Sequence, residues 1–266
     1  MTTQYLRMPI GFGPFPGPRQ IPSPGRRDAA NSPHRTVAAV TYETDAEAIG
    51  ALLPPGFSPL ADASVTVEVQ HLEHIDWLAG RGYSTLGVKF PVQYRGVTER
   101  IEGDFLAVLW ENLADPILSG REELGYAKLW CDIKETSKVS NRRKFLANWL
   151  GHPFFTMELA NLREATSPAA ARRPMLHYKY MPKTGCPGHA DIAYAVVTPA
   201  LNPDITIEKR LSADGAFRFQ QSTWEELPTL FHIVNALAGL PLHRFRSASL
   251  TVSRGGKDLS DQRIIG

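Results

Sequence analysis

The sequence predicts an α+β fold that is mainly antiparallel β, with a few packed helices. Three observations support this class: candidate strands outnumber candidate helices about two to one, their connections are short, and strands do not alternate with helices as in parallel folds. The chain has 266 residues. It contains no repeat and no linker that would divide it, so we expect one domain over 34–266, preceded by an arm over 1–33.

The arm is predicted from its proline and glycine content. Seven of the 21 prolines fall within the first 33 residues. Proline lacks an amide donor and glycine is costly to order, so this segment favours neither a helix nor a central strand. Its GFGPFPG stretch resembles a dinucleotide-binding fingerprint, but it follows no strand and opens no helix. We therefore predict no nucleotide site there.

Strands are predicted where β-branched residues cluster or alternate with polar ones. The clearest strand lies at 65–72, where valines alternate with polar residues: Val65, Val67 and Val69 against Thr66, Glu68 and Gln70. The other strands are expected over 34–43, 83–94, 103–111, 125–133, 192–198, 205–211, 216–220 and 248–253.

Cap signals, apolar faces and a first-turn proline predict helices over 46–53, 141–150 and 228–238. The segment 112–124 is expected to be a loop.

Composition excludes several classes of protein. The 29 basic and 27 acidic residues give a net charge of +2, which argues against a nucleic-acid binder. No segment approaches the roughly 20 apolar residues that span a bilayer, and no signal peptide opens the chain, so a cytoplasmic location is expected. Cys131 and Cys186 favour free thiols, with a single disulfide left open. His71 and His74 fall on opposite faces of a strand, so no metal site is predicted.

The segment SGREELGYAKLW, 119–130, carries the strongest chemical signal. Its lysine, Lys128, lies on a strand among apolar and aromatic neighbours, where burial would disfavour the ammonium and lower its pKa. An ordinary amine with a pKa of about 10.4 is only about 0.04 % neutral at pH 7, and a decrease of about 3–4 units makes the neutral form abundant. A neutral amine can attack a ketone and form a Schiff base. Alternatively, Lys128 lies near a strand end with its ammonium in water.

The polar face of the strand at 65–72 raises a similar choice. If the valines pack in the core, then Glu68 and its polar neighbours face either solvent or a cavity. Half-exposed strands are common, and the residues alone leave both possibilities open.

Several segments together resemble the acetoacetate decarboxylase family. SGREELGYAK is similar to the family segment that carries the Schiff-base lysine, with a pattern close to G-R-E-x-x-x-Y-P-K. The likeness runs without gaps over GDFLAVLWENLADPILSGREELGYAK and extends from about residue 33 to residue 253. Its other anchors are Arg35 with TVAAVTYETD, VTVE (65–68), FPVQYRG (90–96) and, more loosely, RRPMLHYKYMP (172–182) and NALAGLP (235–241).

The resemblance assigns roles residue by residue. Lys128 falls on the Schiff-base lysine, Arg35 on the arginine that meets the substrate carboxylate, and Glu68 on one of two active-site glutamates. It also implies a curved sheet that closes into a cone or barrel around the lysine, a homo-oligomer, and no cofactor.

Three departures from the family pattern bear on the reaction. Thr85 stands where the second glutamate is expected, Leu129 replaces a second lysine, and Ala127 replaces the usual proline. We expect Thr85 to hold a water or a substrate oxygen, and Tyr126 either to line the pocket or to pack.

The expected activity is that of a cofactor-free carbon–carbon lyase acting on a small oxo acid, with decarboxylation of a β-keto acid as its reaction. One alternative is an aldolase-dehydratase that condenses a 2-oxo acid such as pyruvate with an aldehyde. Another is a non-catalytic relative that binds a ligand in the same cavity. No metal, nucleic-acid or membrane partner is expected.

Overall fold

A computed structural model describes residues 6–7, 15–16, 28–166 and 172–266. Most of the predicted arm therefore lies outside the described residues; within it, β1 (Leu6–Arg7) and β2 (Phe15–Pro16) form an antiparallel pair. The rest of the described chain is built on a 14-stranded sheet. Its strands are β3 (His34–Glu43), β4 (Phe57–Pro59), β5 (Ser64–Glu73), β6 (Tyr83–Arg95), β7 (Arg100–Glu111), β8 (Lys128–Trp130), β9 (Asp132–Val139), β10 (Arg142–Trp149), β11 (His152–Glu164), β12 (Met175–Pro182), β13 (Ala190–Thr198), β14 (Thr206–Phe219), β15 (Phe245–Arg254) and β16 (Arg263–Ile265).

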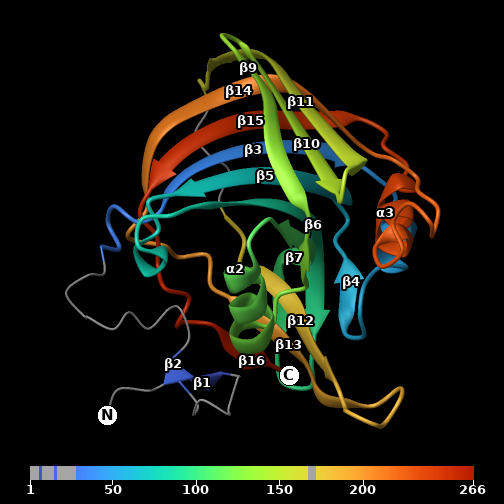
Figure 1. The fold of residues 1–266 in the computed structure, drawn as a ribbon. Coiled ribbons are helices and arrows are strands. Elements are labelled where there is room, and N and C mark those ends of the chain that lie inside the picture. Colours follow the sequence, from blue (N-terminus) through green and yellow to red (C-terminus); the bar gives the residue numbers. More distant parts are fainter. Residues whose placement is uncertain (1–5, 8–14, 17–27, 167–171) are drawn as a thin grey trace.

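The sheet is mainly antiparallel, as predicted, and strongly curved (Figure 1). Its strand order is β16-β13-β12-β7-β6-β5-β3-β15-β14-β11-β10-β9, with β4 beside β6 and β8 beside β7. Two pairs are parallel, β12 with β7 and β7 with β8.

The expectation of a closed cone or barrel was wrong. Closure requires the two end strands of a sheet to hydrogen-bond to each other, whereas the described ladder runs from β16 to β9 without that pairing. The outer strand β9 carries the exposed side chains of Lys134 and Lys138, which are typical of an unpaired edge.

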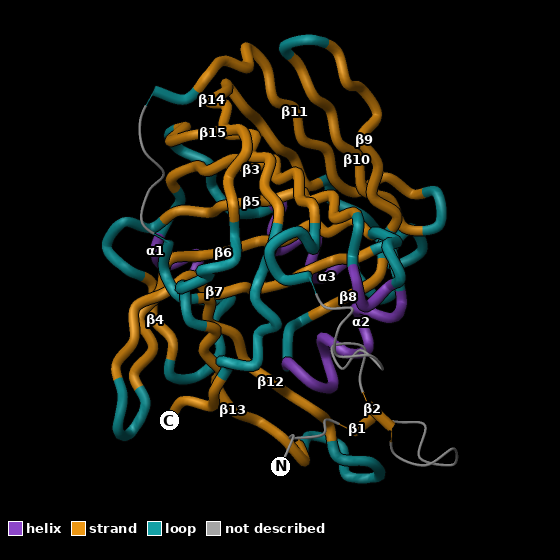
Figure 2. The backbone as a smooth tube through the Cα atoms, turned by 90° about the vertical axis from the view of Figure 1, so that its left-hand side faces the viewer, coloured by secondary structure: helices purple, strands orange, loops and turns teal. Residues whose placement is uncertain are grey.

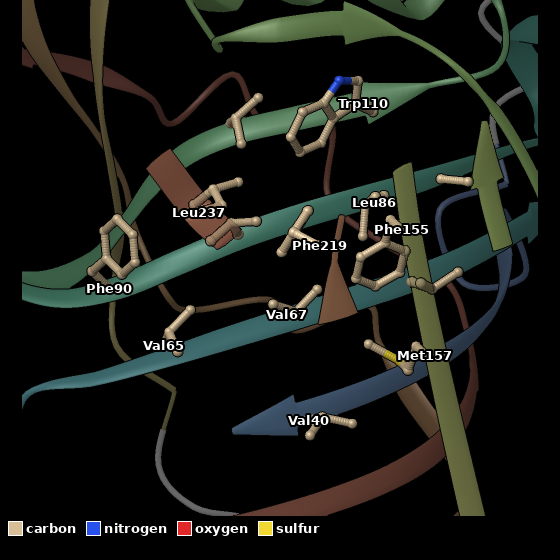
Figure 3. Close-up of a cluster of buried hydrophobic side chains, with 14 of the residues drawn as sticks. Val40, Val65, Val67, Leu86, Phe90, Trp110, Phe155, Met157, Phe219 and Leu237 are labelled. Atoms are coloured by element: carbon tan, nitrogen blue, oxygen red, sulfur yellow. The ribbon is translucent and has the colours of Figure 1, made fainter. Parts of the chain in front are cut away.

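The alternation predicted over 65–72 is confirmed in β5. Val65, Val67 and Val69 are almost fully buried in the main hydrophobic cluster, and Figure 3 shows Val65 and Val67 beside Val40 of β3 and Leu86 of β6. Since successive side chains point to opposite faces of a strand, the polar residues of β5 project away from this core.

Helices are few and short, as expected: α1 (Ala46–Gly50), α2 (Ala114–Ser119) and α3 (Phe231–Ala238). The predicted loop at 112–124 was wrong, because α2 continues directly into a π-helical turn, η4 (Gly120–Leu124). A 3₁₀ turn, η3 (Asp76–Leu78), follows β5. Helix α2 lies next to β8 (Figure 2), so this helical segment borders the predicted lysine.

The helix predicted over 141–150 was also wrong, because this segment is the strand β10. Phe145 and Ala147 are buried at a spacing of two, which is the period of a strand. Leu150, the last residue of the predicted helix, is exposed in the following turn. The strand predicted at 125–133 is divided into β8 and β9 at Cys131, and those predicted at 205–211 and 216–220 form one strand, β14.

Candidate active site

A cavity of about 640 Å³ lies against the polar face of β3, β5, β6 and β7. The five residues selected from the sequence all line it: Arg35, Glu68, Thr85, Tyr126 and Lys128. The polar face of β5 therefore faces a cavity, which resolves the choice left open by its pattern. The roles of the five residues stay a prediction.

The strand register explains how residues distant in sequence meet. Glu68 on β5 pairs with Gly87 on β6, Gly87 with Leu109 on β7, and Leu109 with Lys128 on β8. Paired residues share a face, so Glu68 and Lys128 lie in one row across the cavity floor. Gly87 has no side chain, and the side chains of Leu109 and Leu106 pack over it.

Lys128 has the environment of a buried amine. The residue is 6 % exposed. Its Nζ donates to the backbone oxygen of Pro116 at 2.9 Å and lies 2.8 Å from Oε1 of Glu111 and 5.8 Å from the centre of the Tyr126 ring. Burial lowers the pKa of Lys128 more than Glu111 raises it. The alternative of an ammonium in open water is therefore wrong.

The glycine-bounded turn before Lys128 shapes this environment. A Cβ on Gly120 would overlap the outer atoms of the Lys128 side chain, so any other residue there would force that side chain to shift. Arg121 donates to the backbone oxygen of Lys128 at 2.9 Å. The far end of the turn is fixed by β12, where His177 donates to the oxygen of Leu124 at 2.8 Å and Lys179 donates to that of Glu122 at 2.6 Å.

Glu111 is a site residue that sequence reasoning missed. It lies at the end of β7, is 1 % exposed, and lines the cavity beside Lys128. Burial raises the pKa of its carboxyl, and Lys128 opposes that rise. The available signal was an acidic residue that directly follows the apolar run 105–110 of this strand.

The position of Glu111 also bears on the glutamate that is absent at residue 85. Thr85 and Glu111 are directly paired across β6 and β7. Two of their oxygens, Oγ1 of Thr85 and Oε2 of Glu111, are buried and have no hydrogen-bond partner in the described part of the chain. A carboxylate thus occupies the site one strand away from its expected position.

Glu68 is held in an ion pair inside the cavity. Its Oε1 lies 2.6 Å from Nζ of Lys89 on β6, and Gln70 donates to its Oε2 at 3.3 Å. Lys89 was also missed, although it is the one lysine in the apolar stretch 83–94 and so shares the feature that drew attention to Lys128.

Arg35 supplies positive charge at the edge of the cavity near Tyr83. Its Nε is buried and has no hydrogen-bond partner among the described residues. Burial lowers the pKa of Arg35, and nearby Tyr83 and Glu68 oppose that decrease. A largely buried guanidinium with a free donor favours an anion as its partner.

Tyr126 combines lining and packing roles. Its hydroxyl is 2.9 Å from both Oγ1 of Thr198 and Nε2 of Gln262, and its ring centre lies 4.3 Å from that of His177. Its ring therefore forms a fixed wall beside Lys128.

The family model for acetoacetate decarboxylase matches residues 7–254. The chain belongs to the acetoacetate decarboxylase family. No curated protein matches its sequence.

The fold is similar to that of several solved enzymes. Acetoacetate decarboxylase from Legionella pneumophila is 18 % identical, with a TM-score of 0.65 and 93 % of each chain covered. The enduracididine biosynthesis enzyme MppR in complex with pyruvate is 16 % identical, with a TM-score of 0.62 and coverage of 88 % of this chain and 89 % of that one. An acetoacetate decarboxylase-like enzyme from Sphingomonas wittichii RW1 is 15 % identical, with a TM-score of 0.61 and coverage of 87 % and 93 %.

The described residues contain no group of three or more His, Cys, Asp or Glu side chains that could hold a metal ion. His71 instead pairs with Oγ of Ser84 at 2.7 Å. Over the same residues, every helix is too short or too polar to cross a membrane. Cys131 and Cys186 are both free thiols.

Proposed function

We propose that this member of the acetoacetate decarboxylase family is a cofactor-free carbon–carbon lyase that forms a Schiff base between Lys128 and a small oxo acid. The observation that carries the proposal is the buried Nζ of Lys128 at the wall of a cavity that also contains the Arg35 guanidinium, whose Nε has no hydrogen-bond partner among the described residues. Burial favours the neutral amine, which is the nucleophilic form.

The reaction begins when the Lys128 nitrogen attacks the keto carbon and water departs, leaving a protonated iminium. For a β-keto acid, the electron pair of the bond to the carboxylate then moves into the iminium, CO₂ leaves, and an enamine forms. Protonation at carbon and addition of water release the ketone and restore the amine. Arg35 orients the carboxylate through charge-assisted hydrogen bonds, and Glu68 supplies the proton.

An aldolase-dehydratase is the second candidate, because Thr85 in place of the second glutamate removes a proton-transfer group expected of a decarboxylase. With a 2-oxo acid, the iminium loses a proton from the adjacent carbon instead of CO₂, and the enamine then attacks an aldehyde. MppR has been solved with pyruvate and with a condensation product of pyruvate and imidazole 4-carboxaldehyde. A non-catalytic relative that binds an oxo acid is the third possibility.

Borohydride trapping separates these functions. The protein is incubated with acetoacetate or pyruvate and reduced, and the modified peptide is identified by mass spectrometry. A decarboxylase yields an isopropyl group on Lys128 from acetoacetate, because CO₂ has left before reduction. An aldolase-dehydratase traps pyruvate with its carboxylate intact and forms an unsaturated product when an aldehyde is added.

The matched control uses the other lysine of the cavity. K128A must abolish the adduct, whereas K89Q must leave its position unchanged. No adduct on the wild-type protein, or an adduct that persists in K128A, would refute the Schiff-base proposal. The cytoplasmic location, the homo-oligomer and the division into an arm (1–33) and one domain (34–266) stay predictions.

A further inference from the structure

We propose that Glu111 is the second catalytic carboxylate of this site, which takes a proton from the Lys128 ammonium and delivers it to the oxygen that leaves during Schiff-base formation. The inference rests on the proposed function, because it assigns a partner to the same nucleophile. It differs from the family pattern, in which the second glutamate would stand at residue 85 and the chain has threonine.

The contact between the two side chains carries the inference. Oε1 of Glu111 is 2.8 Å from Nζ of Lys128, which is the distance of a direct, charge-assisted hydrogen bond. A proton can therefore pass between these atoms without an intervening group. The carboxyl is 1 % exposed, so bulk water does not compete for this proton.

The second oxygen of Glu111 extends this reach to the substrate. Oε2 is buried and has no hydrogen-bond partner among the residues that the structure describes, although a buried carboxylate oxygen normally accepts a hydrogen bond. Opposite it on β6, Oγ1 of Thr85 is also buried, and the described part of the chain offers it no hydrogen-bond partner. Both residues line the cavity, so the hydroxyl of a carbinolamine on Lys128 could occupy the space between them, donating to one oxygen and accepting from the other.

The proton balance closes within this pair. Transfer from the ammonium to Glu111 leaves a neutral amine and a carboxylic acid. The amine nitrogen attacks the keto carbon, and a proton moves from that nitrogen to the former carbonyl oxygen to give the carbinolamine. Glu111 then protonates this hydroxyl, the carbon–oxygen bond breaks, and water leaves. The iminium and the Glu111 carboxylate remain, and no outside acid or base is consumed.

Burial brings the two groups closer in acidity. It lowers the pKa of Lys128 and raises that of Glu111, which makes transfer between them less uphill than in water. The other ionisable side chains that face the pair are Tyr83, whose pKa is raised by burial, and Tyr126. A pH profile of the pair therefore reports mainly on Lys128 and Glu111.

The test measures the rate of borohydride trapping with pyruvate as a function of pH in the wild type, E111Q and T85V. General acid–base catalysis contributes about 10²–10⁴-fold, so we expect E111Q to trap at least about 100-fold more slowly across the whole profile. T85V keeps the carboxylate and should slow trapping only several-fold. Thermal unfolding monitored by circular dichroism shows whether each variant is folded.

A counter-ion alone would give the opposite result. If Glu111 only balanced the charge of Lys128, E111Q would lower the pKa of the amine further, and trapping at neutral pH would become faster. A faster or unchanged rate in folded E111Q therefore overturns the inference while leaving the Schiff base intact. Absence of an adduct on the wild type overturns the proposed function itself. If E111Q does not fold, E111D, which keeps the charge but withdraws the oxygens, must also slow trapping, and an unchanged rate in E111D overturns the inference.

Discussion

Lys128→Met tests whether Lys128 and Glu111 are as fully excluded from water as the structure indicates. Methionine keeps the length and the apolar stem but removes the ammonium. Glu111, at 1 % exposure, then loses its partner at 2.8 Å. An unpaired buried carboxylate is strongly destabilising, by about 3–5 kcal/mol in comparable cases. The carboxyl can avoid this cost only by taking up a proton.

Protonation of Glu111 sets the magnitude and the sign of the pH dependence of stability in K128M. Protonating a carboxyl with an ordinary pKa of about 4.3 costs about 4 kcal/mol at pH 7 and about 1 kcal/mol at pH 5. In K128M the folded pKa of Glu111 lies above its unfolded value, so the folded chain binds more protons, and stability is present at low pH and lost as pH rises. We therefore expect a penalty of up to about 4 kcal/mol at pH 7 that shrinks to about 1 kcal/mol at pH 5.

Urea unfolding of the wild type, K128M and K128M/E111L at both pH values measures these differences. The double variant removes both charges, and replacing a whole buried pair by apolar side chains is often neutral or stabilising. We expect it to recover most of the stability that K128M loses at pH 7. The loss of unfolding free energy in K128M could instead be equal at the two pH values, or the double variant could be no more stable than K128M. Either result would refute the conclusion that Lys128 and Glu111 form a buried ion pair excluded from water.

Three further predictions concern the surroundings of the lysine. G120A places a Cβ against the Lys128 side chain and should slow trapping by at least about 10-fold, whereas G50A, whose added Cβ would meet nothing closer than 3.8 Å, should leave the rate unchanged. R35Q should weaken trapping of pyruvate by about 10–100-fold but not of acetone, which has no carboxylate; equal losses for both ketones would rule out a carboxylate-binding role. Burial holds the pKa of His177 at about 4, so the folded chain binds fewer protons than the unfolded one. The free energy of unfolding should therefore decrease by about 2 kcal/mol between pH 7 and pH 5. Urea unfolding of H177Q at the two pH values should not show that decrease.

Much of the site follows from local pattern because a strand alternates its faces. The valines of β5 identify the core side, and this places Glu68 on the opposite side before any partner strand is known. Local pattern also draws attention to Lys128, a single lysine in an apolar strand, but it leaves open whether the ammonium reaches water, and the family resemblance was needed to favour the buried amine. Both deductions use residues that are neighbours in sequence.

Glu111 could not be found by the same reasoning, because its role depends on register. It reaches Lys128 only because β8 pairs in parallel beside β7, and it reaches Thr85 only through the antiparallel register of β6 and β7. A shift of one residue in either ladder would turn its side chain to the other face. The error over 141–150 has a related cause: its apolar residues fit a helical face, and pairing with β9 and β11 makes the segment a strand.

The cavity contains two lysine–carboxylate pairs, and their surroundings distinguish them. Lys89 and Glu68 keep side-chain exposures of 14 % and 19 %, whereas the corresponding values for Lys128 and Glu111 are 7 % and 1 %. The additional burial comes from the turn at Gly120 and from the ring of Tyr126, which close over Lys128. Since desolvation favours a neutral amine, this difference in burial makes Lys128, rather than Lys89, the candidate nucleophile of the cavity. The sequence motif around Lys128 thus contributes the turn and the aromatic ring that bury this lysine more deeply than Lys89.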